Sequence, residues 1–181
     1  MDPRYAKVED YRTVGENNVT IVKEEPNFEV SGVLAEDQNQ RNGIPLIFSV
    51  SPDAAVPDDS VCDWRIYEFI GELNPRSVRL SGSSCFLFGS ERRLADDESG
   101  DLQFIPLDHA SCSRQHAVIQ FRNRGGVVKP YVMDLNSSNK SYLNNATLDP
   151  GRYVELRNQD IIKFGKSESE FVVMNAFSDT M

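Results

Sequence analysis

The chain has 181 residues, of which 39% are hydrophobic and 26% are charged, a composition typical of a globular protein with some extended segments. No apolar run approaches the roughly 20 residues that a membrane-spanning helix needs, so we expect no membrane association. The net charge of −9 argues against nucleic-acid binding as the main activity, because an acidic surface repels a phosphate backbone. Cys62, Cys85 and Cys112 lack the spacing of a metal site, so we expect reduced thiols, an intracellular protein, and neither a metal nor another cofactor.

The first 60 residues read as two segments without regular structure. Residues 1–25 mix charges with scattered apolar side chains whose period fits neither a strand nor a helix. We predict a flexible arm that becomes ordered on a partner, with a solvated tail as the alternative. Residues 26–60 are rich in turn signals, which predicts irregular backbone packed on the next domain and one short hairpin at Asn42-Gly43.

From about residue 61, short runs rich in β-branched and aromatic residues recur between turns, and no 10-residue stretch has helical amphipathicity. The runs are 64–70, 78–81, 85–88, 103–105, 117–121, 127–133, 153–156, 161–164 and 171–174. About nine short strands at this spacing predict an all-β fold, a β-sandwich. Pro130 predicts a strand edge or a bulge, and residues 96–101 predict an exposed acidic loop.

Two polar stretches flank the hairpin formed by the runs at 117–121 and 127–133. The first is 113–116 (Ser-Arg-Gln-His), and the second is 134–144. Loops on either side of one hairpin emerge at the same end of a sheet, so we predict a binding surface there. Their hydroxyls, amides and cations donate hydrogen bonds, which is the chemistry that an anion requires.

Four side chains of these stretches suit a phosphorylated ligand. Ser113 and Ser138 offer hydroxyl donors, Arg114 offers a cation, and Asn139 offers an amide that bridges two backbone groups. His116 precedes an apolar strand, a place where an imidazole more often fixes a loop than performs chemistry. Clusters of Ser, Asn and Asp are also common in ordinary turns, so neither stretch carries the prediction alone.

The combined pattern resembles the forkhead-associated (FHA) domain. The matching motifs are Ser-x-x-His at 113–116, Asp-Leu-x-Ser-x-Asn-x-Ser-x-Leu-Asn at 134–144, Leu-Phe-Gly at 87–89 and Asp-Ile-Ile-Lys-Phe-Gly at 160–165. The resemblance covers residues 61–176, which leaves 177–181 as a tail, and it implies an eleven-stranded β-sandwich that binds phosphothreonine peptides through loops at one end. It also implies the individual roles: phosphate contacts from Ser113, Arg114 and Ser138, a peptide-backbone contact from Asn139, and loop stabilisation by His116.

This chain departs from the family pattern at the first loop. Family members usually have Gly-Arg where this chain has Gly89-Ser90, and that arginine supplies the main cationic contact to the phosphate. Arg92 and Arg93 are candidate replacements, and alternation along an extended strand would place Arg92 on the same side as Ser90.

Two glycines of the family pattern are also replaced in the second stretch. Asn136 tolerates a left-handed conformation, whereas Lys140 puts the geometry of the turn in question but adds charge.

Further segments resemble one group of FHA proteins, namely residues 26–32, 92–96, 105–118, 128–135 and 150–156. The group contains the fungal pre-mRNA leakage protein, the animal Smad nuclear-interacting protein and the plant protein Dawdle. The resemblance implies a nuclear, non-enzymatic subunit of the retention-and-splicing complex. Its arm, residues 1–25, would dock on an RNA-recognition-motif subunit beside a Bud13-type subunit, and its loop face would bind a phosphothreonine protein.

Three other functions compete with this one. If Ser90 abolishes phosphate binding, the chain is a purely structural splicing subunit whose interface is residues 1–60. Trp64, Tyr67 and Phe69 would form a stacking platform for RNA, although aromatic residues in strands are more often core. The two histidines are not accompanied by a Gly-x-Ser-x-Gly elbow, a metal-ligand spacing or a nucleotide loop, so we expect no enzyme and no catalytic residue.

Overall fold

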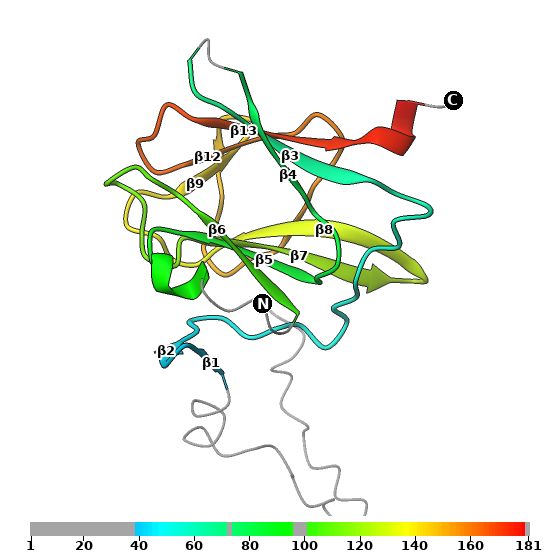
Figure 1. Cartoon of the computed structure of the whole chain (residues 1–181), viewed down its shortest axis with the longest axis horizontal. Coiled ribbons are helices and arrows are strands. Elements are labelled where there is room, and N and C mark those ends of the chain that lie inside the picture. The colour runs from blue at the N-terminus through cyan, green and yellow to red at the C-terminus, as the bar shows by residue number, and fades with distance from the viewer. Residues whose placement is uncertain (1–38, 72–73, 96–100, 180–181) are drawn as a thin grey trace, which may run out of the picture.

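The computed structural model of this chain describes residues 39–71, 74–95 and 101–179 (Figure 1). Its strands are β1 (Gln40–Arg41), β2 (Ile44–Pro45), β3 (Trp64–Phe69), β4 (Arg76–Arg79), β5 (Cys85–Gly89), β6 (Leu102–Pro106), β7 (Ala117–Arg124), β8 (Val127–Asp134), β9 (Ser141–Leu143), β10 (Ala146–Thr147), β11 (Val154–Glu155), β12 (Ile161–Phe164) and β13 (Glu170–Asn175). Two 3₁₀ turns, η2 (Arg92–Ala95) and η3 (Ala176–Asp179), complete the described elements.

Two sheets pack face to face (Figure 1). One has six strands in the order β10-β9-β12-β13-β3-β4, and the other has five in the order β11-β8-β7-β5-β6. All pairs are antiparallel except β5 with β6. In the part of the chain that the structure describes, these two sheets hold eleven strands, so the predicted FHA-type β-sandwich is confirmed.

Aromatic rings from both sheets fill the core between them. The Phe88 ring of β5 stacks on Phe164 of β12 with centroids 5.0 Å apart and meets Phe171 of β13 edge-on at 6.1 Å. Such pairs add about 0.5–1.5 kcal/mol beyond the burial of their apolar area. All five residues of β5 are buried, because a second apolar cluster covers the other face of this sheet.

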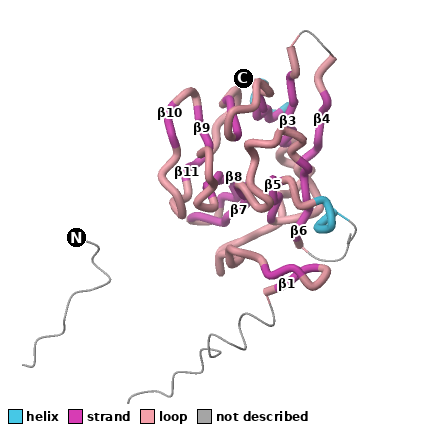
Figure 2. The backbone as a smooth tube through the Cα atoms, turned by 90° about the vertical axis from the view of Figure 1, so that its left-hand side faces the viewer, coloured by secondary structure: helices cyan, strands magenta, loops and turns pink. Residues whose placement is uncertain are grey.

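That second cluster is where the segment before the sandwich docks. The Phe48 side chain is buried against Leu87, Val118 and Met133 on the outer face of the five-stranded sheet. The predicted hairpin at Asn42-Gly43 is present as β1 and β2. Figures 1 and 2 show it outside this sheet, on the side of η2. The boundaries predicted at residues 25 and 60 stay predictions, and the arm, residues 1–25, and most of the acidic loop lie outside the described residues.

The structure corrects the interpretation of Pro130. The predicted bulge is absent, because the pairing of β7 with β8 is continuous through Pro130. The predicted edge agrees with the other side of β8, where β11 pairs with Tyr131 and Val132 and ends before Pro130. Pro130 stands opposite Phe121, whose N–H bonds to Ser84 and whose C=O accepts from Ala55. The proline nitrogen therefore faces away from β7, and no bond between β7 and β8 is lost.

Two strands, β9 and β10, were not predicted. They join through Asn144-Asn145, which have φ of 49° and 67° and so form a two-residue turn of the kind that tight hairpins use.

The fold does not support the RNA-stacking platform considered for Trp64, Tyr67 and Phe69. Because β3 pairs regularly, Trp64 points toward the core with Ile66, whereas Tyr67 and Phe69 lie on the opposite face. The three rings therefore do not share one surface.

Three further observations concern the chemistry of the chain. All three cysteines are free. Among the described residues, no group of three His, Cys, Asp or Glu side chains is arranged to hold a metal ion. Within the same residues, no helix has the length and apolar character needed to cross a membrane.

Asp53 anchors the preceding segment to β7 through ion pairs of 2.8 Å with Arg122 and Arg124. The hydrogen bond from Arg122, together with one from Ser51, lowers the pKa of Asp53 from 3.8 to about 2. A carboxylate whose pKa is lower in the folded state stabilises that state above the unfolded pKa, and this contribution is lost as the pH falls through the folded pKa.

We therefore expect Asp53→Ala to be less stable than wild type above about pH 5, with a difference that shrinks between about pH 4 and pH 2. Urea unfolding of both proteins across this range measures the difference. Asp149→Ala, which removes an exposed carboxylate paired with Arg152, is the control and should show no such gap. A gap for Asp53→Ala that stays constant down to pH 2 would contradict the assignment.

Candidate functional site

The connections β5–β6, β6–β7, β8–β9 and β12–β13 meet at one end of the sandwich, the end that carries η2 in Figure 1. The Ser138 N–H donates to the Ser113 hydroxyl at 3.1 Å, and the Asn139 amide donates to the Ser111 carbonyl at 2.8 Å. The prediction that the two polar stretches meet at one rim is therefore confirmed. The Ser113 hydroxyl accepts in this bond and keeps its own proton.

His116 lies beneath this rim and is fully buried. Its Nδ1 accepts the Ser113 N–H at 3.0 Å, and its Nε2 donates to the Lys140 carbonyl at 3.1 Å. This pattern requires a neutral ring with its proton on Nε2. Burial lowers the pKa of His116, against smaller opposing effects of the Lys140 bond and of Asp134. Because the ring bonds to the Ser113 backbone and not to its hydroxyl, it is not placed to activate that hydroxyl as a nucleophile.

The second loop is held by one buried carboxylate. Asp134 accepts the Ser137 N–H at 2.9 Å and the hydroxyls of Ser137 and Ser141 at 2.6 Å each. The loop also uses left-handed backbone at Asn136 and Lys140, with φ of 57° and 67°. The turn that the family makes with glycine is therefore retained here, with Lys140 in a conformation that non-glycine residues adopt only at an energetic cost.

Gly89 lets the end of β5 pass directly against the first loop. A Cβ at this position would lie 1.9 Å from the Arg114 carbonyl oxygen. The next two N–H groups, of Ser90 and Glu91, donate to the carbonyls of Ser113 and Arg114 at 3.1 and 3.2 Å. The Ser90 hydroxyl donates to the Cys112 carbonyl at 3.2 Å. Ser90, which stands where the family usually has arginine, therefore links the β5–β6 connection to the β6–β7 connection and carries no charge.

The three arginines near this rim have different surroundings. Arg92 pairs with Asp108, and Arg93 pairs with Glu91 at 2.8 Å. Hydrogen bonds from Arg93 lower the pKa of Glu91, and the positive charge of Arg114 lowers it a little further. Within the described residues, Arg114 itself has no ion pair. The alternation argument for Arg92 does not hold, because residues 92–95 form the 3₁₀ turn η2 in place of an extended strand.

A pocket of about 510 Å³ brings part of the predicted site together. Its polar lining includes Arg93, Ser113 and Arg114, whereas Arg92, Ser138 and Asn139 lie outside the lining. The pocket also has an apolar side that sequence reasoning missed, formed by Ile44, Pro45, Ile47 and Leu135. No local motif marks those residues, since Ile44, Pro45 and Ile47 belong to the docked segment, nearly 70 positions before Arg114 in the chain.

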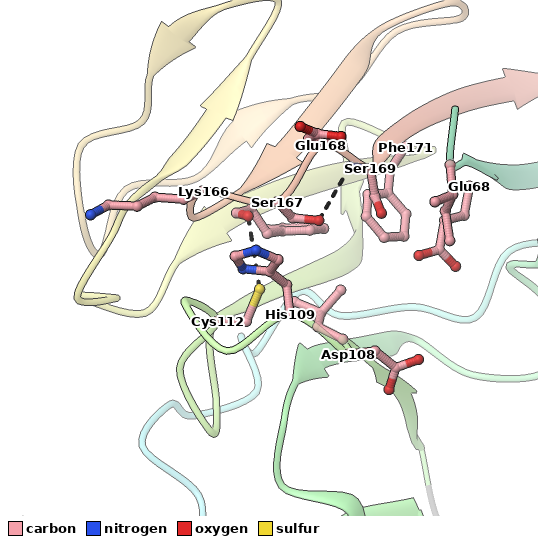
Figure 3. A pocket seen from close by; sticks show the side chains of 12 residues that line it. Glu68, Asp108, His109, Cys112, Lys166, Ser167, Glu168, Ser169 and Phe171 are labelled. Atoms are coloured by element: carbon pink, nitrogen blue, oxygen red, sulfur yellow. Dashed lines mark hydrogen bonds between the residues drawn. The ribbon is translucent and has the colours of Figure 1, made fainter. Parts of the chain in front are cut away.

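A second cavity of about 420 Å³ lies on the other side of the β6–β7 loop (Figure 3). Core side chains such as Leu107, Cys112 and Phe164 contribute to its lining, and its charged residues have both signs, with Glu68 and Lys166 among them. Burial raises the pKa of Glu68. The Ser111 hydroxyl beside this cavity lies 2.7 Å from His109 Nδ1 and also accepts the Lys166 N–H.

The sequence matches the FHA domain family over residues 88–165. It is 45% identical over 174 residues to the FHA domain-containing protein DDL of Arabidopsis thaliana, covering 91% of this chain and 52% of that protein. It is 34% identical over 174 residues to pre-mRNA leakage protein 1 of Saccharomyces cerevisiae, covering 83% of this chain and 85% of that protein. This chain belongs to that family of FHA-domain proteins.

The solved structure of the yeast Pml1 splicing factor is similar to this FHA protein, with a TM-score of 0.60 and 30% identity over 71% of this chain and 97% of that one. The resemblance inferred from the motifs is therefore confirmed at the level of the family. The chain spans about half the length of the plant relative and somewhat less of the mammalian Smad nuclear-interacting proteins that it also matches.

The contact at Gly89 generates a test. We expect Gly89→Ala to lower the free energy of unfolding by about 1–3 kcal/mol or more, because the Arg114 carbonyl cannot retreat without breaking its bond to Glu91. Urea unfolding gives the stability, and amide NMR shifts of residues 113–116 report the displaced loop.

Gly125→Ala is the matched control. Its φ of 63° makes alanine unfavourable there, but its Cβ would meet nothing within 4 Å, so the shifts of residues 113–116 should stay as in wild type. A Gly89→Ala protein with wild-type stability and unchanged loop shifts would contradict the close contact.

Proposed function

We propose that this FHA protein is a non-enzymatic interaction subunit of a nuclear pre-mRNA splicing and retention complex, and that its loop face binds a phosphothreonine segment of a partner. The yeast relative, of which this chain covers 85%, is described as a splicing factor integrated into the RES complex. The observation that carries the binding proposal is that Arg93, Ser113 and Arg114 line one pocket, beside loops that the buried His116 joins by two hydrogen bonds.

The chemistry of this pocket suits a phosphate group. The Ser113 hydroxyl has an acceptor bond from Ser138 and keeps its own proton for a phosphate oxygen. The guanidinium of Arg114, with no ion pair among the described residues, supplies charge-assisted bonds, and Ser138 at the adjoining rim offers a further hydroxyl. We assign the contact with the backbone of a bound peptide to the neighbouring Asn139, whose amide donates one bond to the Ser111 carbonyl and has a further N–H and an oxygen to offer.

The missing family arginine weakens this site without removing its charge. A charged hydrogen bond contributes about 1.5–3 kcal/mol, so Ser90 in place of arginine lowers phosphopeptide affinity by roughly tenfold to more than a hundredfold relative to a complete site. Arg93 partly compensates, because it lines the same pocket, although Glu91 neutralises it. Arg92, which pairs with Asp108, makes no contribution in this arrangement.

A purely structural subunit is the second candidate, favoured by the same two features: the Ser90 hydroxyl bonded to Cys112 and the Arg93–Glu91 ion pair. In that case the FHA face reads no phosphate, and assembly rests on the residues before the sandwich.

Arg114→Ala should reduce affinity for a selected phosphothreonine peptide by roughly 10- to 100-fold, because the pocket loses its unpaired cation. A peptide array selects the ligand, and calorimetry measures the dissociation constant for the phosphorylated and unphosphorylated forms. Arg92→Ala is the control, because Arg92 pairs with Asp108 and does not line the pocket. The dissociation constant of this variant should stay within about twofold of wild type. Phosphate-dependent binding that survives both Ser113→Ala and Arg114→Ala unchanged would move the pocket elsewhere, and absence of any such binding would favour the structural subunit.

The partners form a separate part of the proposal. We expect the arm, residues 1–25, to dock on the RNA-recognition-motif subunit of the retention-and-splicing complex, beside a Bud13-type subunit. A pull-down with purified RNA-recognition-motif subunit should therefore recover the full chain but not a chain that lacks residues 1–25. Arg114→Ala serves as the control and should be recovered like wild type, because its pocket is not part of this contact. Undiminished recovery of the shortened chain would refute the docking role of the arm.

A further inference from the structure

The pocket that contains Arg114 has a wall that does not come from the loops of the sandwich. Gly43, Ile44, Pro45 and Ile47, which precede the region matched to the FHA domain, line it together with Arg93, Ser113 and Arg114. The pocket, at about 510 Å³, is far larger than one phosphate group, and it falls in the range of sites that hold an organic ligand. It therefore has room for a peptide side chain beside the phosphate.

The docked segment is fixed to the first loop by a buried glutamine. The Gln115 side chain donates to the Pro45 carbonyl at 2.8 Å and accepts the Ile47 N–H at 3.1 Å. Gln115 lies between the phosphate-site candidate Arg114 and the buried His116, so the wall and the cationic side of the pocket share one anchor. Asn42 adds a bond of 2.7 Å to the Arg93 carbonyl from the hairpin turn.

Two neighbouring side chains of this segment have opposite surroundings. Phe48 is buried in the outer cluster, whereas Ile47 is 60% exposed at the pocket. Asn39 braces the segment with bonds to the carbonyls of Leu46 and Phe48. The backbone at Ile47 is therefore held in place before any ligand arrives, which lowers the ordering cost of a contact with this residue.

We propose that this segment makes the site selective for a phosphothreonine peptide that carries an aliphatic side chain close to the phosphorylated residue; this inference rests on the proposed phosphothreonine binding. The cationic side chains are complementary to the phosphate. Ile44, Pro45, Ile47 and Leu135 give the apolar part of the lining of the same pocket, where an aliphatic group removes apolar surface from water. Ile47 is the specificity-determining residue of this wall.

The test uses the full chain and a phosphothreonine peptide library in which leucine, alanine or aspartate is fixed in turn at each of the three positions on either side of the phosphothreonine. We expect at least one position at which leucine binds roughly five- to tenfold more tightly than alanine. Ile47→Ser should abolish that ratio while leaving the alanine peptide bound as by wild type. This pattern, measured as a double-mutant cycle, isolates the contact between Ile47 and the leucine.

Val50→Ser is the matched control. Val50 is an aliphatic residue of the same segment, 46% exposed, that does not line the pocket, so the leucine preference should persist in this variant. Phosphate-dependent binding with no leucine preference, or with a preference that Ile47→Ser leaves intact, would overturn the apolar wall but not the proposed function. Loss of all phosphate dependence in the wild-type library would overturn the proposed function and this inference with it.

Discussion

A single uncharged imidazole holds the loop end of this sandwich together. His116 accepts from one loop and donates to the other, and the Lys140 carbonyl that it reaches also accepts the Gly165 N–H of a third loop at 2.8 Å. A second proton on the ring would remove the acceptor that Ser113 uses and would place a charge where burial already lowers the pKa of His116. Because the folded state disfavours the charged ring, this contribution to stability is present above the unfolded pKa near 6.5 and declines as the pH falls below it.

The rim above His116 is therefore rigid without being strongly charged. Its order comes from backbone groups and small polar side chains: Asp134 satisfies three donors, and Ser90 and Ser113 each bond across to a neighbouring loop. In a chain with a net charge of −9, such a surface attracts a phosphate only where a cation is left unpaired. Under the proposed function, the number of unpaired arginines then sets the affinity for a phosphate, and the other residues that line the pocket set its specificity.

Sequence reasoning succeeded where a local pattern is enough. Runs such as 117–121 and 161–164 read as strands because their β-branched and aromatic residues are bounded by turns, and the meeting of the Ser113 and Asn139 loops followed from one hairpin. It failed where a conformation depends on distant contacts. Residues 92–95 form η2, in which Leu94 is buried in the outer cluster and Arg92 pairs with Asp108. No periodicity in the sequence predicts this turn.

The apolar wall of the pocket is the clearest case of a long-range feature. Residues 26–60 were predicted as irregular backbone, and irregular backbone has no periodicity from which the direction of Ile47 follows. Its direction depends on two bonds from Gln115, a residue 68 positions away from Ile47, and on the burial of Phe48 in a cluster built from β5, β7 and β8. A domain boundary drawn from FHA motifs alone, at 88 or at 61, would therefore exclude part of the pocket that those motifs line. In this protein the pocket begins before the unit that carries the family signature, because the buried Gln115 side chain couples the two.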